Sequence, residues 1–430
     1  MGIQNITKAL IKTGARLWYI YSDKNRLEYR SVDNGKPSPH AGIIVQDVPS
    51  GFSADVDAQD HIHLICQSLS GEILYFHFAG QEWDKQVLTK YEPSRYSIKY
   101  PVIKLLGKDI HVFFAMGNLY NSIDWTLYHY FWHNGQWKTL KIGHINLGRL
   151  MSHFQVDFDI SGNIHIIYRD KAQKSYGIYY AGFDNEFGIW SSPEAITSDD
   201  KSPGYPAFLI HGNMMHIVWN NVYKNHICVE YGSIDLDRGK NKVIKKSRII
   251  SPEGIDAMRP IISYTDQKLW ITWLNNGDIY SACSDDSGNT WQYNNAVHLP
   301  ENVQAEYFGY IDKNLPYLNL VYGYVNDTIS SVPSISYKQM HEHQPADKQI
   351  QASDLDDSAV IDMAMERISA QVNEIKTRQA DLLQLLVNAD RQYQQILDAI
   401  EPLEQLNNDI KAKTLRKGGI ITLLRKWLSI

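Results

Sequence analysis

The chain has 430 residues, which is enough for one large domain and an appendage. Its net charge is −6, but residues 411–430 carry six Lys and Arg and no acid, so the remainder has a net charge of −12. An acidic body argues against nucleic-acid binding by the main domain.

No apolar run is long enough for a transmembrane helix, and the N-terminus lacks the basic and apolar regions of a signal peptide. The expected location is therefore the cytoplasm, with a peripheral membrane or cell-surface location by a non-classical route as the alternative. The three cysteines, Cys66, Cys228 and Cys283, are too sparse for a disulfide framework or a zinc site, and buried thiols are expected. No cofactor-binding motif occurs, so neither a cofactor nor a metal is expected.

A short run that predicts a β-strand recurs seven times before residue 340, at intervals of about 45 to 54 residues. Six of the copies contain a central His or Trp, and the last has Tyr317. The copies lie at 16–21, 61–65, 109–114, 163–168, 214–219, 268–273 and 315–322. This period is that of a four-stranded propeller blade. The sequence therefore predicts an all-β propeller over residues 1–340, with seven blades favoured and six, with one mispaired repeat, as the alternative.

The predicted blades follow one another along the chain at about 9–46, 51–89, 100–142, 153–196, 205–250 and 259–299. The last repeat offers only three strands, near 305–311, 316–323 and 332–338. Because open sheet edges invite aggregation, we expect residues 2–7 to supply the missing outer strand of the last blade.

One segment of the sixth repeat, Ser284-Asp285-Asp286-Ser287-Gly288-Asn289-Thr290-Trp291, resembles the Asp-box of sialidase-like (BNR-repeat) propellers at all five fixed positions. A weaker echo is Phe183 to Trp190. The resemblance covers about residues 1–338 and implies the fold rather than the activity, because the family's N-terminal Arg-Ile-Pro motif is absent. In such a turn the Asp should cap the backbone, the Gly should take a positive φ and the Trp should pack between blades.

Three inner strands open with an aromatic or guanidinium side chain followed by proline, at Tyr100-Pro101, Tyr205-Pro206 and Arg259-Pro260. The fourth repeat has His153 in the corresponding place, preceded by Arg149. These five residues are predicted to surround one mouth of the central channel and to bind an acidic or polyhydroxylated ligand. The arrangement is similar to BNR-type polysaccharide lyases. That resemblance implies that His153 or Tyr205 would act as base and Arg259 would offset a uronate charge. A third possibility is that the residues only cap the channel.

The strand histidines, His63, His111, His165 and His216, recur once per repeat. They are interpreted as structural, because different blades would hold them too far apart for one metal. His341 and His343 lie in a polar linker, 341–357, and are expected to be solvated.

A heptad pattern of apolar residues runs from Ile361 to Ile410 and predicts a coiled coil over 358–415. Isoleucine at the d positions favours three or more strands over a parallel dimer. The predicted coiled coil would therefore self-associate the chain, with a trimer or a higher oligomer favoured. Leu383, Leu385 and Leu397 widen the apolar seam, which also fits an intramolecular helix pair.

Beyond Gly418-Gly419, residues 416–430 predict a basic amphipathic helix. Its apolar face comprises Ile420, Leu423, Leu424, Trp427 and Leu428, flanked by Lys417, Arg425 and Lys426. Such a segment binds an anionic membrane surface, docks on a partner or packs on its own chain, and the sequence leaves these three open.

The sequence as a whole favours a non-enzymatic binding protein, in which a propeller head recognises a glycan or protein and a coiled coil provides avidity. The alternative is a carbohydrate-active enzyme, a polysaccharide lyase or glycosidase, acting on an acidic polysaccharide.

Overall fold

A computed structural model describes residues 2–33, 36–48, 51–120, 124–133, 135–146, 154–172, 175–197, 203–237, 242–244, 246–294, 296–299, 305–324 and 334–335. The predicted linker, coiled coil and C-terminal helix lie outside the described residues. All elements in the described part are β-strands, and none of its segments forms a helix of the length and apolarity needed to cross a bilayer.

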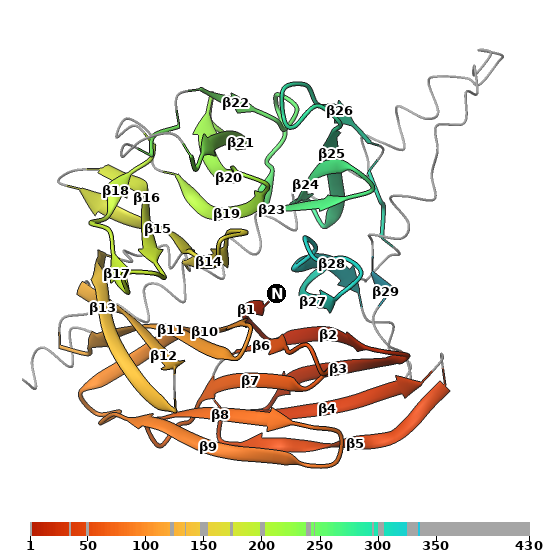
Figure 1. Ribbon diagram of the computed structural model, residues 1–430. Coiled ribbons are helices and arrows are strands. Elements are labelled where there is room, and N and C mark those ends of the chain that lie inside the picture. The colour runs from red at the N-terminus through yellow and green to blue at the C-terminus, as the bar shows by residue number, and fades with distance from the viewer. Residues whose placement is uncertain are drawn as a thin grey trace, which may run out of the picture. The chain divides into compact units, whose positions relative to one another are not determined.

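The described strands form six sheets arranged around a common centre, which makes the domain an all-β propeller (Figure 1). Three sheets have four strands in sequential order, as expected for propeller blades. These strands are β10 (Tyr96–Leu106), β11 (Asp109–Asn118), β12 (Asp124–His133) and β13 (Gln136–Asn146); β19 (Gly204–His211), β20 (Met214–Tyr223), β21 (His226–Asp235) and β22 (Ser247–Ile249); and β23 (Met258–Thr265), β24 (Lys268–Asn275), β25 (Asp278–Ser284) and β26 (Gln292–Tyr293).

A fourth sheet splits its outer strand into two short pieces that both pair with the third strand. Its strands are β14 (Gln155–Phe158), β15 (Ile164–Ala172), β16 (Ser175–Asp184), β17 (Ile189–Trp190) and β18 (Glu194–Ala195). The break between β17 and β18 falls at Ser191-Ser192-Pro193, and proline cannot donate to a ladder.

The prediction of seven blades is wrong, because the first and last repeats share one seven-stranded sheet. β2 (Lys8–Thr13) pairs in parallel with β27 (Glu306–Asp312), with Ala9 opposite Gly309. The other strands of this sheet are β3 (Arg16–Asp23), β4 (Arg26–Asp33), β5 (Lys36–Gln46), β28 (Leu320–Tyr324) and β29 (Ser334–Ile335). The propeller therefore has six blades, the alternative of one mispaired repeat.

The expected role of residues 2–7 is also wrong. β1 (Gly2–Ile6) pairs antiparallel with β6 (Phe52–Val56), the inner strand of the second repeat, so it extends that sheet toward the centre. β7 (Ile62–Gln67), β8 (Glu72–Phe78) and β9 (Trp83–Lys90) complete the sheet. Figure 1 shows β1 and the N-terminus in the middle of the ring. Because β2 and β27 already join the first repeat to the last, closure does not need β1 at the outer edge.

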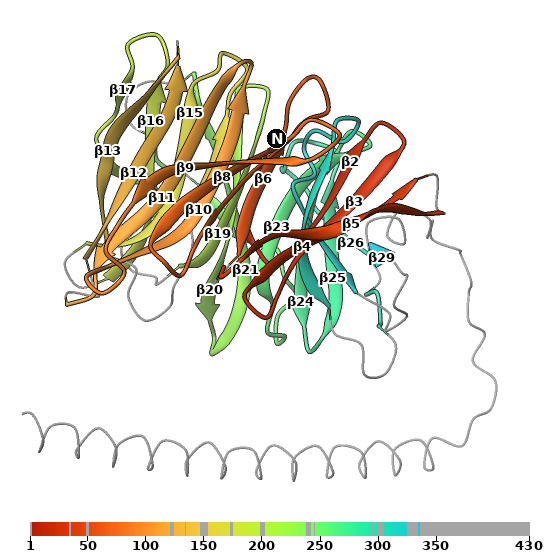
Figure 2. The same ribbon diagram turned by 90° about the horizontal axis from the view of Figure 1, so that it is seen from below.

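Each sheet packs face to face on its neighbours, so the second strands are buried on both faces (Figure 2). All six residues of β7 are buried, for example. Trp18 and Ile20 pack with Leu64 and Phe76 in one inter-sheet core, and the remaining cores repeat this arrangement. All three cysteines are free and buried, as predicted.

Polar side chains on the inner strands also link neighbouring sheets. Ser53 Oγ and Asp55 Oδ2 of β6 accept hydrogen bonds from the backbone N–H groups of Ile103 and Leu105, at 3.0 and 2.8 Å. From β10, the buried Lys104 reaches Asp157 of β14 at 3.1 Å. These bonds fix how one inner strand sits against the next, which positions the side chains at the centre.

Candidate ligand-binding site at the inner-strand bulges

Tyr100, Tyr205 and Arg259 occupy equivalent and unusual backbone positions in three inner strands, β10, β19 and β23. Their φ angles are 57°, 48° and 51°, and each is followed by proline at a point where the strand register shifts. A positive φ is costly for residues with a side chain, by about 1 kcal/mol or more. Such strain persists only where the surroundings impose it, and it concentrates at functional sites. We call these three residues the bulge cluster.

The backbone of Arg259 is held on both sides. Its N–H donates to Asn220 Oδ1 at 2.9 Å, and the Asn220 amide donates in turn to the carbonyl of Ala257 at 2.7 Å. The hydroxyls of Tyr307 and Tyr322 both donate to the Arg259 carbonyl. Asn220 and Tyr322 are buried, so three side chains from two other sheets impose the strained conformation.

The side chains of the bulge cluster converge. The Arg259 guanidinium lies 5.9 Å from the centre of the Tyr205 ring, a cation–π contact. Burial, with a smaller contribution from the neighbouring Tyr205, raises the pKa of Tyr100 to about 12. Arg259 is exposed, and no carboxylate of the described residues lies within ion-pair distance of it. The cluster thus presents an available cation beside the Tyr205 ring.

A second arginine, Arg169, holds the backbone just before Tyr205. Arg169 is only 4% exposed; its Nε donates to the carbonyl of Pro203 at 2.7 Å and its guanidinium lies 3.6 Å from the centre of the Tyr176 ring. Burial lowers the pKa of Arg169, and the nearby Tyr176 opposes that shift. Arg169 therefore anchors the segment that leads into the Tyr205 bulge.

The sequence predicted five residues at this mouth, and the structure brings three of them together. Arg149 and His153 lie outside the described residues. The proline-preceding positions are not strand openings in every case, since β10 begins four residues before Tyr100. Sequence reasoning missed Asn220, Tyr307 and Tyr322, because their contacts join sheets far apart in the chain and no motif marks them.

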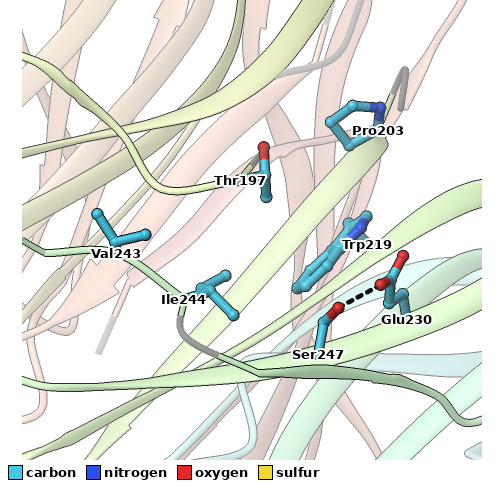
Figure 3. Close-up of a pocket in the computed structure, with 7 residues that line it drawn as sticks. All are labelled: Thr197, Pro203, Trp219, Glu230, Val243, Ile244 and Ser247. Atoms are coloured by element: carbon cyan, nitrogen blue, oxygen red, sulfur yellow. Dashed lines mark hydrogen bonds between the residues drawn. The ribbon is translucent and has the colours of Figure 1, made fainter. Parts of the chain in front are cut away.

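A small pocket is lined by side chains of β20, β21 and β22 and of the segments that flank their sheet (Figure 3). It has a volume of about 200 Å³, and its lining includes Pro203, Trp219 and Glu230. The buried Glu230 carboxylate accepts hydrogen bonds from Ser247 Oγ and from Asn221 Nδ2, the latter at 2.6 Å. Ligand pockets usually measure about 300–1,000 Å³, so this one suits a single small group.

The strand histidines are buried, as predicted for a structural role. Three of them bond a hydroxyl two register positions away on the third strand: His63 bonds Tyr75, His165 bonds Tyr180 and His216 bonds Tyr231, at 2.7, 2.9 and 2.8 Å. His111 bonds His129 instead, at 3.0 Å. Burial lowers the pKa of both His111 and His216 to about 4.

The Asp-box segment has the predicted local geometry. The Thr290 hydroxyl donates to Asp286 Oδ2 at 2.6 Å, and Asp286 Oδ1 accepts from the Thr290 N–H at 2.7 Å and from Ser284 Oγ at 2.8 Å. These bonds, that of the Thr290 hydroxyl above all, lower the pKa of Asp286 to about 2. Gly288 has a φ of 88°, and the Trp291 ring lies 5.1 Å from that of Tyr231 in the neighbouring sheet. The turn follows the end of a third strand, whereas the bulge cluster lies toward the start of the inner strands. It therefore stands at the other end of the sheets.

Comparison with known proteins places the chain in no family: no family model matches it, and no curated protein does. Solved structures share the fold. The polysaccharide lyase Uly1 has a TM-score of 0.48 and 10% identity, over 76% of this chain and 88% of that chain. The six-bladed fungal lectin from Aleuria aurantia has a TM-score of 0.42 and 13% identity, over 70% and 99%. The propeller domain of the Trilobed protease from Pyrococcus furiosus has a TM-score of 0.43 and 7% identity, over 77% and 95%. At these identities the similarity concerns the fold alone.

Proposed function

We propose that the propeller head binds an acidic carbohydrate at the bulge cluster, without chemistry. The observation that carries the proposal is the exposed Arg259, held in a strained backbone conformation beside the Tyr205 ring. A guanidinium presents its donors in a planar fork that fits a carboxylate with two hydrogen bonds. An aromatic ring beside it offers an apolar face for a sugar ring.

Binding is proposed rather than catalysis because the tyrosine hydroxyls of the site with a raised pKa are poor general bases, and His153, a candidate base, lies outside the described residues. An effective general base has a pKa near the working pH. Burial raises the pKa of Tyr100 to about 12 and raises those of Tyr307 and Tyr322 further. These hydroxyls are therefore protonated at neutral pH. The hydroxyls of Tyr307 and Tyr322 are also engaged with the backbone of Arg259.

We further propose that the heptads of residues 358–415 join several heads, so that weak single-site binding to a repetitive polysaccharide gains avidity. The basic residues of 416–430 would then attach the assembly to an anionic membrane surface. The heptad pattern and the segregation of apolar and basic residues in the C-terminal segment support this arrangement.

The test is a binding screen of the full-length protein with polygalacturonate and alginate as acidic polymers and dextran as the neutral one. We expect retention by an acidic polymer, weakened by salt and absent with dextran. Arg259→Ala should abolish retention. Arg248→Ala is the matched control, because Arg248 contacts the Asp-box turn at the other end of the sheets.

The same samples distinguish the enzymatic alternative. A lyase generates unsaturated uronate, seen as a rise in ultraviolet absorbance, whereas a binding protein leaves the polymer intact. Equal retention of acidic and neutral polymers, or none of either, would contradict the proposal.

A further inference from the structure

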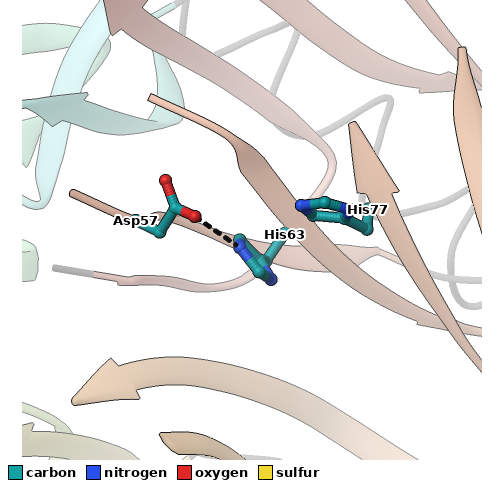
Figure 4. A group of neighbouring side chains, drawn as sticks. All are labelled: Asp57, His63 and His77. Carbon is teal, nitrogen blue, oxygen red and sulfur yellow. Dashed lines mark hydrogen bonds and ion pairs between the residues drawn. The ribbon is translucent and has the colours of Figure 1, made fainter. Parts of the chain in front are cut away.

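Within the described residues, one group of side chains has the composition and spacing of a metal site. The group comprises Asp57, His63 and His77, and one ligand atom from each lies within 4.8 Å of the others (Figure 4). Asp57 follows β6, His63 lies on β7 and His77 lies on β8, so two of the three stand on paired strands. His61 adds a fourth nitrogen, since its Nδ1 lies 3.0 Å from Asp57 Oδ2.

His63 has the surroundings of a metal ligand. Its Nδ1 bonds the Tyr75 hydroxyl at 2.7 Å, and its Nε2 points to Asp57 Oδ2 at 3.5 Å. Metal-ligating histidines commonly use the second ring nitrogen for such a bond, which fixes the orientation of the ring.

The fourth sheet contains the same framework without two of the ligands. Asp159 Oδ2 lies 3.2 Å from His165 Nε2, and His165 Nδ1 bonds the Tyr180 hydroxyl at 2.9 Å. Asn163 stands in place of His61 and makes the same 3.0 Å bond to the aspartate. Gly182 stands in place of His77, since each is the register partner of the strand histidine.

Comparing the β6–β9 sheet with the β14–β18 sheet distinguishes the residues that the turn requires from those that could be present to bind a metal. The Asp–His–Tyr chain is a repeat feature that serves the fold in both sheets. His61 and His77 are not required by it, because asparagine and glycine replace them in the fourth sheet. In the β6–β9 sheet, His61 and His77 each add an imidazole nitrogen near Asp57.

We infer that Asp57, His63 and His77, with His61 as a fourth ligand, bind a divalent d-block cation such as Zn²⁺. Imidazole nitrogen binds zinc and other d-block cations, whereas calcium and magnesium take oxygen ligands, so the histidines favour a d-block cation and the carboxylate is compatible with it. Tetrahedral ligands on zinc stand about 3.4 Å apart, so the side chains would close by about an ångström around the ion. The proposed metal site lies where inner strand β6 ends, whereas the bulge cluster lies toward the start of the inner strands. The metal proposal therefore does not depend on carbohydrate binding at the bulge cluster.

Charged groups near the turn are compatible with a cation. Lys313 reaches across from the last repeat but is paired with Asp60 and bonds the carbonyl of Ala58. Asp84 is the register partner of His77 on β9 and adds negative charge to the same row.

The test is titration of the EDTA-treated full-length protein with ZnCl₂ by calorimetry, with thermal unfolding measured in parallel. The informative variant is His77→Phe, because Phe131 occupies the corresponding position in the β10–β13 sheet. We expect it to weaken zinc binding at this site at least tenfold and to remove the zinc-dependent rise in melting temperature. His61→Asn, the residue of the fourth sheet, should weaken binding less.

Two controls complete the design. His165→Gln alters the equivalent histidine of the fourth sheet and should bind zinc as the wild type does. A His341→Ala, His343→Ala double variant removes the other closely spaced histidines of the sequence and should retain the site. Wild-type protein that binds no zinc, unchanged affinity in His77→Phe, or complete loss of binding in the double variant would overturn the inference.

Discussion

At the scale of single residues, the bulge cluster differs from the strand histidines, because its residues have a strained backbone whereas the histidines are buried and hydrogen-bonded. Tyr100, Tyr205 and Arg259 are held in an unfavourable backbone conformation that the fold could avoid with glycine. The strand histidines, by contrast, are buried without backbone strain, and the ring of each forms a hydrogen bond, as those of His63 and His216 do with a tyrosine hydroxyl. The proline that follows each bulge residue was visible in the sequence, but the positive φ and the partners that impose it were not.

The buried histidines predict a dependence of stability on pH. Burial lowers the pKa of His111 and His216 to about 4, while an unfolded histidine has a pKa of about 6.5. Between those values the unfolded chain binds more protons than the folded one. Stability is therefore complete above about pH 6.5 and is lost as pH falls toward 4, by about 3 kcal/mol for each such residue.

Urea unfolding of the full-length protein at pH 7 and pH 4.5 measures this loss. His216→Gln keeps a hydrogen-bonding group beside Tyr231 but does not titrate, so the difference in unfolding free energy between the two pH values should shrink. An identical difference in the variant would show that His216 does not contribute.

At the scale of elements, the strands and turns were largely predictable and the closure of the ring was not. The recurring strand cores and the turn at Ser284 to Trp291 depend on local sequence. Six of the seven cores and the turn appear where the sequence placed them, whereas the last core, predicted at 315–322, is a strand only from Leu320. The pairing of β2 with β27 joins residues about 300 apart in the chain. No local pattern distinguishes that pairing from a separate seventh blade, and β1 at the centre was equally hidden.

The buried ion pair between β10 and β14 predicts an asymmetry between its two partners. Lys104 is 1% exposed and Asp157 20% exposed, with 3.1 Å between Nζ and Oδ1. Asp157→Leu leaves a buried cation without its partner and should lower the unfolding free energy by about 3 kcal/mol. A Lys104→Met, Asp157→Leu double variant should recover most of that loss.

Chemical denaturation of the two single variants and the double variant gives the coupling energy. The pair of Lys90 and Glu72, whose lysine is 72% exposed, is the control, and Lys90→Met should cost less than about 1 kcal/mol. Additive losses in the double variant would mean that the pair does not hold the two sheets together.

At the scale of the whole molecule, the chain has a six-bladed head and a C-terminal segment whose heptads predict self-association. Light scattering should find the full-length protein trimeric or larger, and a chain that ends before residue 355 monomeric. A monomeric full-length protein would remove the avidity argument. An oligomeric head would place the interface on the propeller instead.

We infer that the backbone strain at Arg259 is maintained for ligand binding, and paired affinity and stability measurements on two variants check this inference. Arg259→Gly and Arg259→Ala both remove the guanidinium, but only glycine relieves the positive φ. We predict that both lose binding to the acidic polymer retained by the wild type, while Arg259→Gly unfolds at equal or higher denaturant concentration than Arg259→Ala. Wild-type affinity in either variant, or glycine destabilising the head more than alanine, would contradict the account.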